Sequence, residues 1–331
     1  MKNIVVLGSN SFAGSSFVNF ALNKNYKVIG ISRSKEKSKL ELKYKNNLLK
    51  NKNFKFYKLD INKNIVKIIE IIKRIKKPVF IIDFAGQGMV AESWDNPGLW
   101  FKTNVMNKIN FIEELKKIKI NRYIRISTPE VYGSSNKMLL EENTHNPSTP
   151  YALTHSSIDK YLKLQKKEFN FPALILRFSN FYGECQPIYR IIPKTIVSIL
   201  KGKKLNLHGG GLSSRSFIYI DDFSNAIFKA INLRKQNQMV FNISSKEIIT
   251  IRELVKKICQ KMNVNYKNMV KISKDRRAKD KKYLMNSNKA KNILKWSNST
   301  SLNQGLNNTI KWYVKNFDKI KNLNEKYIHK I

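Results

Sequence analysis

Residues 3–23, NIVVLGSNSFAGSSFVNFALN, carry the strongest signal of fold class in this chain. The apolar run at 3–7 predicts a buried strand, residues 8–14 a glycine turn and residues 15–23 a helix. A glycine turn directly between a strand and a helix lets backbone N–H groups and the helix N-terminus face a pyrophosphate. Two glycines also suit an ordinary tight strand–helix turn, so it is the position after the first strand that favours phosphate binding.

The alternation of apolar strands and amphipathic helices continues along the first half of the chain. Isoleucines recur at helical spacing from Ile65 to Ile75 until Pro78 ends the pattern, and a longer helix is expected at 152–169. Further strands are expected at 27–32, 54–59, 79–84, 122–127 and 173–178. This alternation predicts an α/β fold with a doubly wound parallel sheet of Rossmann type.

After Asn180 the alternation gives way to segments rich in Gly, Ser and charge, which predict loops. We therefore expect residues 1–180 to form a dinucleotide-binding domain. Residues 181–331 are expected to form mainly a smaller α/β substrate-binding domain, with 217–245 packing back on the first. No role is predicted for the tail after Phe317.

The composition is that of a globular protein, because 42% of the 331 residues are hydrophobic and can form a sizeable core. No run of about 18 apolar residues occurs, so no membrane span is expected. Two cysteines cannot build a disulfide framework and predict a reduced, cytoplasmic setting.

The net charge of +40 comes mostly from 52 Lys that are spread along the whole chain. A nucleic-acid-binding protein would concentrate its basic residues on one face, so no nucleic-acid partner is expected. Such a field nevertheless attracts anionic small molecules, nucleotides included.

The end of the second predicted strand indicates which dinucleotide is bound. NAD sites usually carry an acidic residue there for the ribose 2′-hydroxyl, whereas this chain has Ser-Arg-Ser-Lys at 32–35. Arg33 could pair with a 2′-phosphate, which favours NADP over the alternative, NAD. Arg33 could also be an ordinary surface charge in a Lys-rich protein.

A set of polar side chains suits proton transfer from a hydroxyl group. Tyr151 opens a predicted helix and His155 follows one turn later on the same face. Thr128 and Glu130 come directly after the strand at 122–127, at the sheet edge where open α/β sheets bind their ligands. Each residue alone is as well explained by structure, but together and in this order they indicate a catalytic site.

Because of the glycine turn and the polar residues described above, the chain resembles the extended short-chain dehydrogenase/reductases that act on nucleotide sugars. It is most similar to the NDP-hexose 4,6-dehydratases of the dTDP-glucose and GDP-mannose types. The resemblance covers roughly residues 1–315 and rests on VLGSNSFAGS, FAGQGMVAESWDNP, STPEVYG, NPSTPYALTH, RFSNFYG, IIPKTI, LHGGGLSSRSFIYIDD and RRAKD.

The resemblance implies a reaction on the sugar. Thr128 and Tyr151 help remove the proton of the C4 hydroxyl while a hydride passes to the nicotinamide. Glu130 then removes the C5 proton, water leaves from C6, and the hydride returns to C6. The product is a 4-keto-6-deoxy sugar, and Glu130 favours a dehydratase over an epimerase of the same fold.

The resemblance also implies a homodimer and a set of binding residues. Those for the cofactor are Gly8, Ser11, Phe12, Ala13, Gly14, Arg33, Asp60, Ile61, Ala85, Gly86, Asn104, Tyr151 and His155. Those for the nucleotide-diphosphate hexose are Gln87, Asn180, Lys194, Arg215 and Arg277. Arg277 lies in a basic run that could instead be a solvated loop, and His145, His208 and His329 show no metal-ligand spacing.

Three positions depart from the family pattern. Ser11 replaces the middle glycine of the turn, and His155 replaces the usual Lys. Pro129 stands where dTDP-glucose dehydratases carry an Asp that protonates the leaving hydroxyl, an Asp that GDP-mannose dehydratases also lack. A neutral imidazole would leave Tyr151 without a nearby permanent cation, so we expect a slow enzyme that His155→Lys accelerates. A 4-epimerase or reductase of the same fold and a catalytically silent or RNA-binding member remain alternatives.

Overall fold

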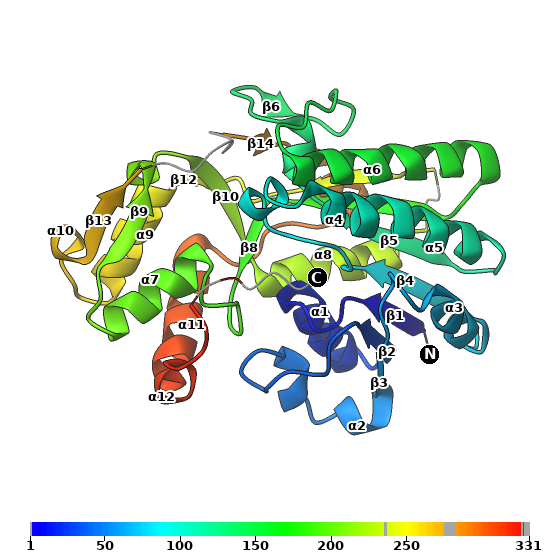
Figure 1. Cartoon of the computed structure of the whole chain (residues 1–331), viewed down its shortest axis with the longest axis horizontal. Coiled ribbons are helices and arrows are strands. Elements are labelled where there is room, and N and C mark those ends of the chain that lie inside the picture. Colours follow the sequence, from blue (N-terminus) through cyan, green and yellow to red (C-terminus); the bar gives the residue numbers. More distant parts are fainter. Residues whose placement is uncertain (1, 235–236, 275–281, 326, 328–331) are drawn as a thin grey trace.

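A seven-stranded parallel sheet forms the centre of the larger part of the molecule (Figure 1). The computed structural model describes residues 2–234, 237–274, 282–325 and 327. The strand order is β11-β7-β5-β4-β1-β2-β3, and every neighbouring pair is parallel. The strands are β1 (Asn3–Leu7), β2 (Lys27–Ser32), β3 (Phe54–Lys58), β4 (Val79–Asp83), β5 (Arg122–Ser127), β7 (Ala173–Phe178) and β11 (Val240–Ile243).

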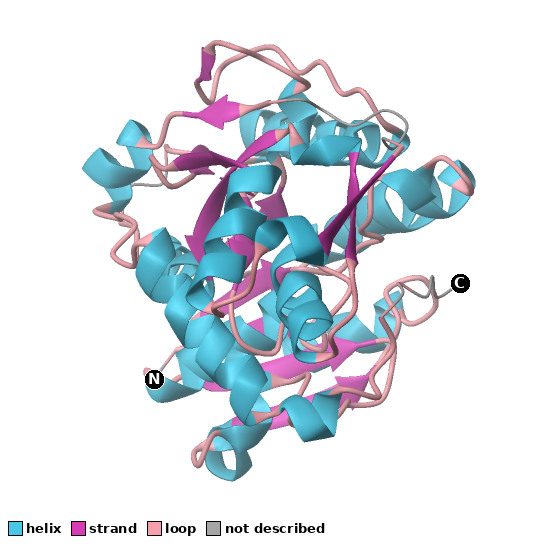
Figure 2. Ribbon diagram, turned by 90° about the vertical axis from the view of Figure 1, so that its left-hand side faces the viewer, coloured by secondary structure: helices cyan, strands magenta, loops and turns pink. Residues whose placement is uncertain are grey.

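Helices cover both faces of this sheet (Figures 1 and 2). They are α3 (Ile65–Lys73), α5 (Asn107–Lys116) and α6 (Pro150–Phe169) on one face, and α1 (Phe12–Asn23) and α8 (Ile220–Ile231) on the other. Val5 and Leu7 pack under the first group, whereas Ile4 and Val6 pack under the second, because successive strand residues point to opposite faces. Both faces of the sheet are therefore buried, as a parallel sheet requires.

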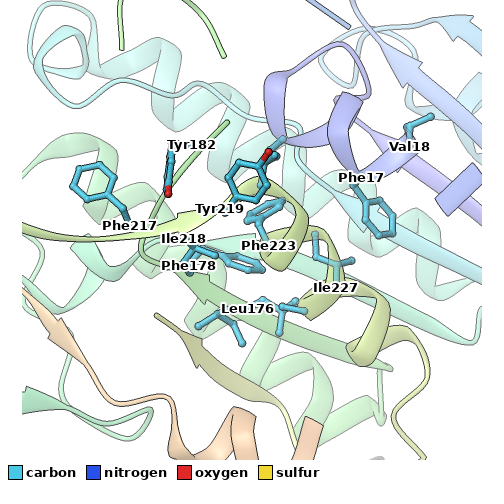
Figure 3. Packing of buried hydrophobic residues seen from close by; sticks show 14 of the residues in the cluster. Phe17, Val18, Leu176, Phe178, Tyr182, Phe217, Ile218, Tyr219, Phe223 and Ile227 are labelled. Carbon is cyan, nitrogen blue, oxygen red and sulfur yellow. The ribbon is translucent and has the colours of Figure 1, made fainter. Parts of the chain in front are cut away.

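Residues far apart in sequence meet in the core beside α1 and α8. Figure 3 shows Phe17 of α1 near Ile227 and Phe223 of α8, with Leu176 of β7 on the sheet beneath them. The Phe223 ring lies 4.2 Å from the Phe178 ring. Helix α8 and strand β11 thus attach part of the second half of the chain to the first.

The other elements lie either in a smaller part at the left of Figure 1 or around the large sheet. Three smaller sheets have the orders β12-β10-β8, β13-β9 and β14-β6. The strands are β6 (Met138–Leu139), β8 (Asn180–Tyr182), β9 (Leu205–His208), β10 (Ser214–Tyr219), β12 (Ile248–Thr250), β13 (Val270–Ser273) and β14 (Leu284–Met285). The helices are α2 (Lys50–Asn53), α4 (Pro97–Phe101), α7 (Ile191–Leu200), α9 (Ile251–Lys261), α10 (Tyr266–Met269), α11 (Leu302–Lys315) and α12 (Phe317–Ile320). Single turns are η1 (Lys43–Asn46), η2 (Ala91–Ser93), η3 (Lys102–Met106), η4 (Pro129–Tyr132), η5 (Gly209–Gly211) and η6 (Ala290–Leu294).

The predicted elements of the first half are confirmed, with small shifts at helix starts. Helix α1 begins at Phe12 rather than at residue 15, because the Ser11 side chain accepts a hydrogen bond from the Gly14 backbone and caps the helix. The expectation of loops after Asn180 is wrong, since short strands and helices fill that part. The division into residues 1–180 and 181–331 stays a prediction. Within the described residues, no helix is both long and apolar enough to cross a membrane.

Candidate active site

A cavity of about 440 Å³ lies at the carboxyl ends of the central strands. The strand order reverses at β1, whose neighbours are β2 and β4, and open α/β sheets bind ligands at such a point. Residues that follow β1, β2, β3 and β4 line the cavity, and most were predicted to bind the cofactor: Gly8, Ser11, Phe12, Arg33, Asp60, Ile61, Ala85 and Gly86. Gln87, which the resemblance assigns to the substrate, also lines it.

The glycine turn after β1 has no room for a side chain at two positions, Gly8 and Gly14. Gly8 has a φ of +80°, and a Cβ there would lie 2.9 Å from the Phe84 backbone. A Cβ on Gly14 would lie 2.3 Å from the Gly8 carbonyl oxygen. The Ser11 hydroxyl donates to that same carbonyl at 2.7 Å. Ser11 therefore stabilises the turn in which the family has its middle glycine.

The segment after β2 is held against this turn by one side chain. The Asn10 amide donates to the carbonyls of Ser34 at 2.9 Å and Lys35 at 3.0 Å, and the Asn10 backbone N–H donates to the Ser32 hydroxyl at 2.9 Å. Arg33 lies between these anchors, half-buried in the cavity wall.

Five predicted cofactor contacts lie outside the cavity wall, namely Ala13, Gly14, Asn104, and Tyr151 and His155, which are described below. Ala13 and Gly14 are buried inside the first turn of α1. Asn104 is fully buried, and its amide is bonded to the Gln87 backbone, accepting from its N–H at 2.7 Å and donating to its carbonyl at 3.0 Å. In this structure Asn104 positions the loop after β4 instead of lining the cavity.

Three of the predicted catalytic residues lie together after β5 and at the start of α6. The Thr128 hydroxyl donates to the Glu130 carboxylate at 3.2 Å. The pKa of Tyr151 is raised above its usual value, first by burial and then by the Glu130 charge, while a hydrogen bond with Thr128 and the charges of Arg190 and Arg125 oppose the rise. Tyr151 is thus a neutral phenol within the electrostatic reach of a carboxylate.

His155 lies beside this group. Its ring centroid is 4.5 Å from that of Tyr151, and its side chain is almost fully buried. The pKa of His155 is held well below 6.5 by burial, by Arg125 and by Lys108, so the imidazole is neutral. The structure places the expected neutral ring beside Tyr151, together with two cations that the sequence did not reveal.

A buried ion pair supports the segment that carries Thr128 and Glu130. Arg177 of β7 and Asp159 of α6 are both fully buried, with Nε and Oδ2 3.0 Å apart. The same Asp159 oxygen accepts from the Ser127 hydroxyl at 2.9 Å, and Arg177 donates to the Tyr132 hydroxyl at 2.6 Å. His145 completes the group at 2.8 Å from Arg177, which gives that histidine a packing role.

The predicted substrate residues are only partly brought together. Asn180 and Arg215 meet around Tyr283, whose hydroxyl is 3.4 Å from the Asn180 side-chain oxygen and whose ring lies 4.5 Å from the Arg215 guanidinium carbon. Lys194 lies on α7. Arg277 lies outside the described residues.

Aromatic and apolar residues from the second half of the chain form the far side of the cavity. We call the residues near the C-terminus the outer wall; they are Trp312, Tyr313, Ile320, Leu323, Asn324 and Tyr327. The Tyr327 ring packs edge-on against Tyr189 at 5.5 Å, and Glu325 pairs with Lys201. No sequence motif marks these residues, because their role arises only from how the chain returns to the sheet.

The residues present fit a nicotinamide dinucleotide. The cavity follows the ends of four parallel strands, the backbone at Gly8 and Gly86 leaves no room for side chains, and the capped N-terminus of α1 lies at the turn. At Gly86, a Cβ would lie 3.0 Å from the Asn104 side-chain oxygen. Such close-packed backbone beside a helix N-terminus suits a pyrophosphate.

Comparison with known proteins agrees with this geometry. The sequence profile of the GDP-mannose 4,6 dehydratase family matches residues 5–309. A trifunctional Arabidopsis thaliana protein with UDP-glucose 4,6-dehydratase activity in its name is 29% identical over 95% of this chain, which spans about half (47%) of that relative's length. The human dTDP-D-glucose 4,6-dehydratase is 27% identical, with 97% of this chain and 93% of the human protein covered.

Solved structures show the same arrangement. The dTDP-glucose 4,6-dehydratase of Bacillus anthracis in complex with NAD superposes with a TM-score of 0.85 at 29% identity, covering 96% of this chain and 98% of that one. The UDP-glucuronic acid 4-epimerase of Bacillus cereus in complex with UDP-glucuronic acid and NAD superposes with a TM-score of 0.85 at 27% identity, covering 95% of this chain and 99% of that one. Both dehydratases and epimerases therefore share this fold.

Proposed function

The chain belongs to the GDP-mannose 4,6 dehydratase family, and from this we propose that it is a nucleotide-sugar 4,6-dehydratase. It converts an NDP-hexose to an NDP-4-keto-6-deoxyhexose with a nicotinamide dinucleotide as recycled cofactor. The observation that carries the proposal is the carboxylate of Glu130, which lies within hydrogen-bonding distance of Thr128 and within the field of Tyr151. Oxidation at C4 alone, as in an epimerase, needs no such group.

The residues divide the proton transfers between them. Tyr151 acts in its ionised form: after its own proton has passed to solvent, the phenolate, with Thr128 bonded to it, accepts the proton of the C4 hydroxyl. Glu130 removes the C5 proton and, because Pro129 offers no acidic group, returns that proton to the C6 hydroxyl as it leaves as water. A nicotinamide dinucleotide bound in the cavity would supply a hydride acceptor for C4 in its oxidised form and a hydride donor for C6 in its reduced form. The proton that Glu130 takes from C5 leaves with the water. As the hydride adds to C6, C5 takes up a proton from solvent, and the C4 hydroxyl proton held by Tyr151 returns to solvent, so the whole reaction balances.

A direct assay tests the proposal. We expect purified protein incubated with a panel of dTDP-glucose, UDP-glucose and GDP-mannose to convert at least one of them to a product lighter by one water, seen by mass spectrometry. A product of unchanged mass but altered retention would indicate a 4-epimerase. No turnover together with steeply salt-dependent RNA binding would indicate the silent alternative.

We also propose that the cofactor is NADP rather than NAD, because Arg33 faces the cavity after β2 and could pair with a 2′-phosphate. The solved relatives named above hold NAD. We expect Arg33→Asp to weaken NADP binding by about 1–3 kcal/mol and NAD binding much less. Titration calorimetry with each dinucleotide measures both values.

Lys35 offers a matched control for Arg33. It is exposed and does not line the cavity, so Lys35→Asp makes a comparable charge change two residues away. Equal losses of NAD and NADP affinity in Arg33→Asp, or an equal loss in Lys35→Asp, would contradict a 2′-phosphate contact.

From the family resemblance we further propose a homodimer that acts in the cytoplasm. Both cysteines are free and buried, which suits a reducing compartment. A monomer mass by sedimentation equilibrium would contradict the dimer.

A further inference from the structure

Two buried cations share a single buried carboxylate beneath the Tyr151–His155 pair. Lys108 of α5 donates to both oxygens of Asp83, at 2.8 and 2.6 Å. Arg125 of β5 lies farther off, with a guanidinium nitrogen 3.7 Å from the same carboxylate. All three side chains are at most 2% exposed. Because Lys108 alone balances Asp83, the ion pair does not require Arg125.

Arg125 makes its closer contact with His155. One of its terminal nitrogens lies 3.2 Å from the His155 Nδ1 atom. A guanidinium group can only donate hydrogen bonds, so Nδ1 must accept and the imidazole proton must be on Nε2. The contact thereby assigns a single tautomer to His155, with an Nε2–H donor on the other side of the ring.

The burial of Arg125 is unfavourable for the stability of the folded protein. The Nε atom of Arg125 is buried and has no hydrogen-bond partner among the described residues. A buried cation that shares its counter-charge and leaves a donor unbonded is costly. An apolar side chain at this strand position would avoid that cost. Because stability does not explain this arginine, we infer that its contact with His155 serves the active site.

We propose that Arg125 is a positioning residue of the active site, which holds His155 as the neutral Nε2–H tautomer and supplies a permanent positive charge in contact with the His155 ring. The inference rests on the proposed function, since it gives Tyr151 and His155 their tasks. His155 is faced by Tyr151 on its own helix, by Arg125 from β5 and by Lys108 from α5. The charges of Arg190 and, to a smaller extent, Arg125 also oppose the rise in the pKa of Tyr151.

This assignment reverses the expectation drawn from sequence for His155→Lys. A lysine at 155 would place a third cation against Lys108 and Arg125 with only Asp83 to balance them. We therefore expect His155→Lys to lower kcat, and the double variant His155→Lys/Arg125→Met to recover part of the loss. Recovery of kcat in the double variant would indicate that the site needs one positive charge at positions 125 and 155 together, rather than two.

The main test compares Arg125→Met with wild type. The variant is expected to fold, because Lys108 still pairs with Asp83. We expect the ¹⁵N NMR signals of the His155 ring to change from the neutral Nε2–H pattern to a mixture of tautomers. We expect kcat with the converted NDP-sugar to fall by about 10- to 100-fold with little change in KM. Arg125→Lys, which keeps the charge, is expected to restore part of kcat.

Arg122→Met is the matched control, because Arg122 is also a buried arginine on β5 but bonds the backbone of Ala230 and Leu233. It is expected to leave the His155 signals and kcat unchanged. Unchanged His155 signals in Arg125→Met, or changed signals with wild-type kcat, would overturn the proposal. If wild type converts none of the NDP-sugars, the proposed function fails, and the NMR result still decides whether Arg125 holds the tautomer.

Discussion

We expect Glu130→Gln to leave C4 oxidation intact and to slow the loss of water by about 10²–10⁴-fold, the usual contribution of a general acid–base group. The amide has the shape of the carboxylate and can still accept from the Thr128 hydroxyl, so the local structure is kept. It cannot take the C5 proton. Absorbance of reduced nicotinamide is expected to accumulate after mixing, while mass spectrometry shows no dehydrated product.

The same substitution tests the electrostatics of Tyr151. The Glu130 charge raises the pKa of Tyr151, so its removal lowers that pKa, and the rate of C4 oxidation is expected to rise at a lower pH than in wild type. Glu142→Gln is the control, because Glu142 is exposed on the segment that follows. Full dehydration by Glu130→Gln would remove Glu130 from the mechanism.

The largest effect on stability is expected from Asp159→Asn. The substitution keeps the shape of the side chain but leaves the Arg177 guanidinium buried without its counter-charge. Removing one partner of a buried ion pair typically costs about 3–5 kcal/mol. Urea unfolding is expected to show this loss as a lower midpoint and a lower free energy of unfolding.

Two comparisons separate burial from charge in this prediction. Glu114→Gln breaks the exposed pair with Lys117 and is expected to cost about 0–1 kcal/mol. The double variant Asp159→Leu/Arg177→Met removes both buried charges and is expected to recover most of the loss. A double variant no more stable than Asp159→Asn would mean that the hydrogen bonds of the group, rather than its charge balance, hold the segment.

The sequence predicts the parts of the site that follow strand ends. Gly8, Arg33, Asp60 and Ala85 each come directly after an apolar run, and a parallel sheet brings all its carboxyl ends to one edge. The strand ends follow from periodicity, which together with residue type predicted Gly8 and Arg33, whereas Asp60 and Ala85 were predicted from the family resemblance. Arg215 and Asn180 were predicted as substrate residues from the family resemblance. In the structure both contact Tyr283.

Other parts of the site could not be predicted. The strands after Asn180 have two to six residues, too few for their alternation to stand out against Gly and Ser. Asp83, Lys108 and Arg125 come from three different elements, and nothing in the spacing shows that they face one another. A signal did exist, because Arg125 interrupts the strand RYIRIS, where a buried strand normally carries apolar residues.

The outer wall has a consequence for how the protein is made. A ribosome synthesises the chain from the N-terminus, so the glycine turn after β1 is made early. Leu323, Asn324 and Tyr327 emerge after every other residue that lines the cavity. During translation the residues of the glycine turn are therefore synthesised before the outer wall that closes the cavity. A nascent chain can meet its dinucleotide but cannot yet enclose it, so secure retention of the cofactor must come after these residues are synthesised.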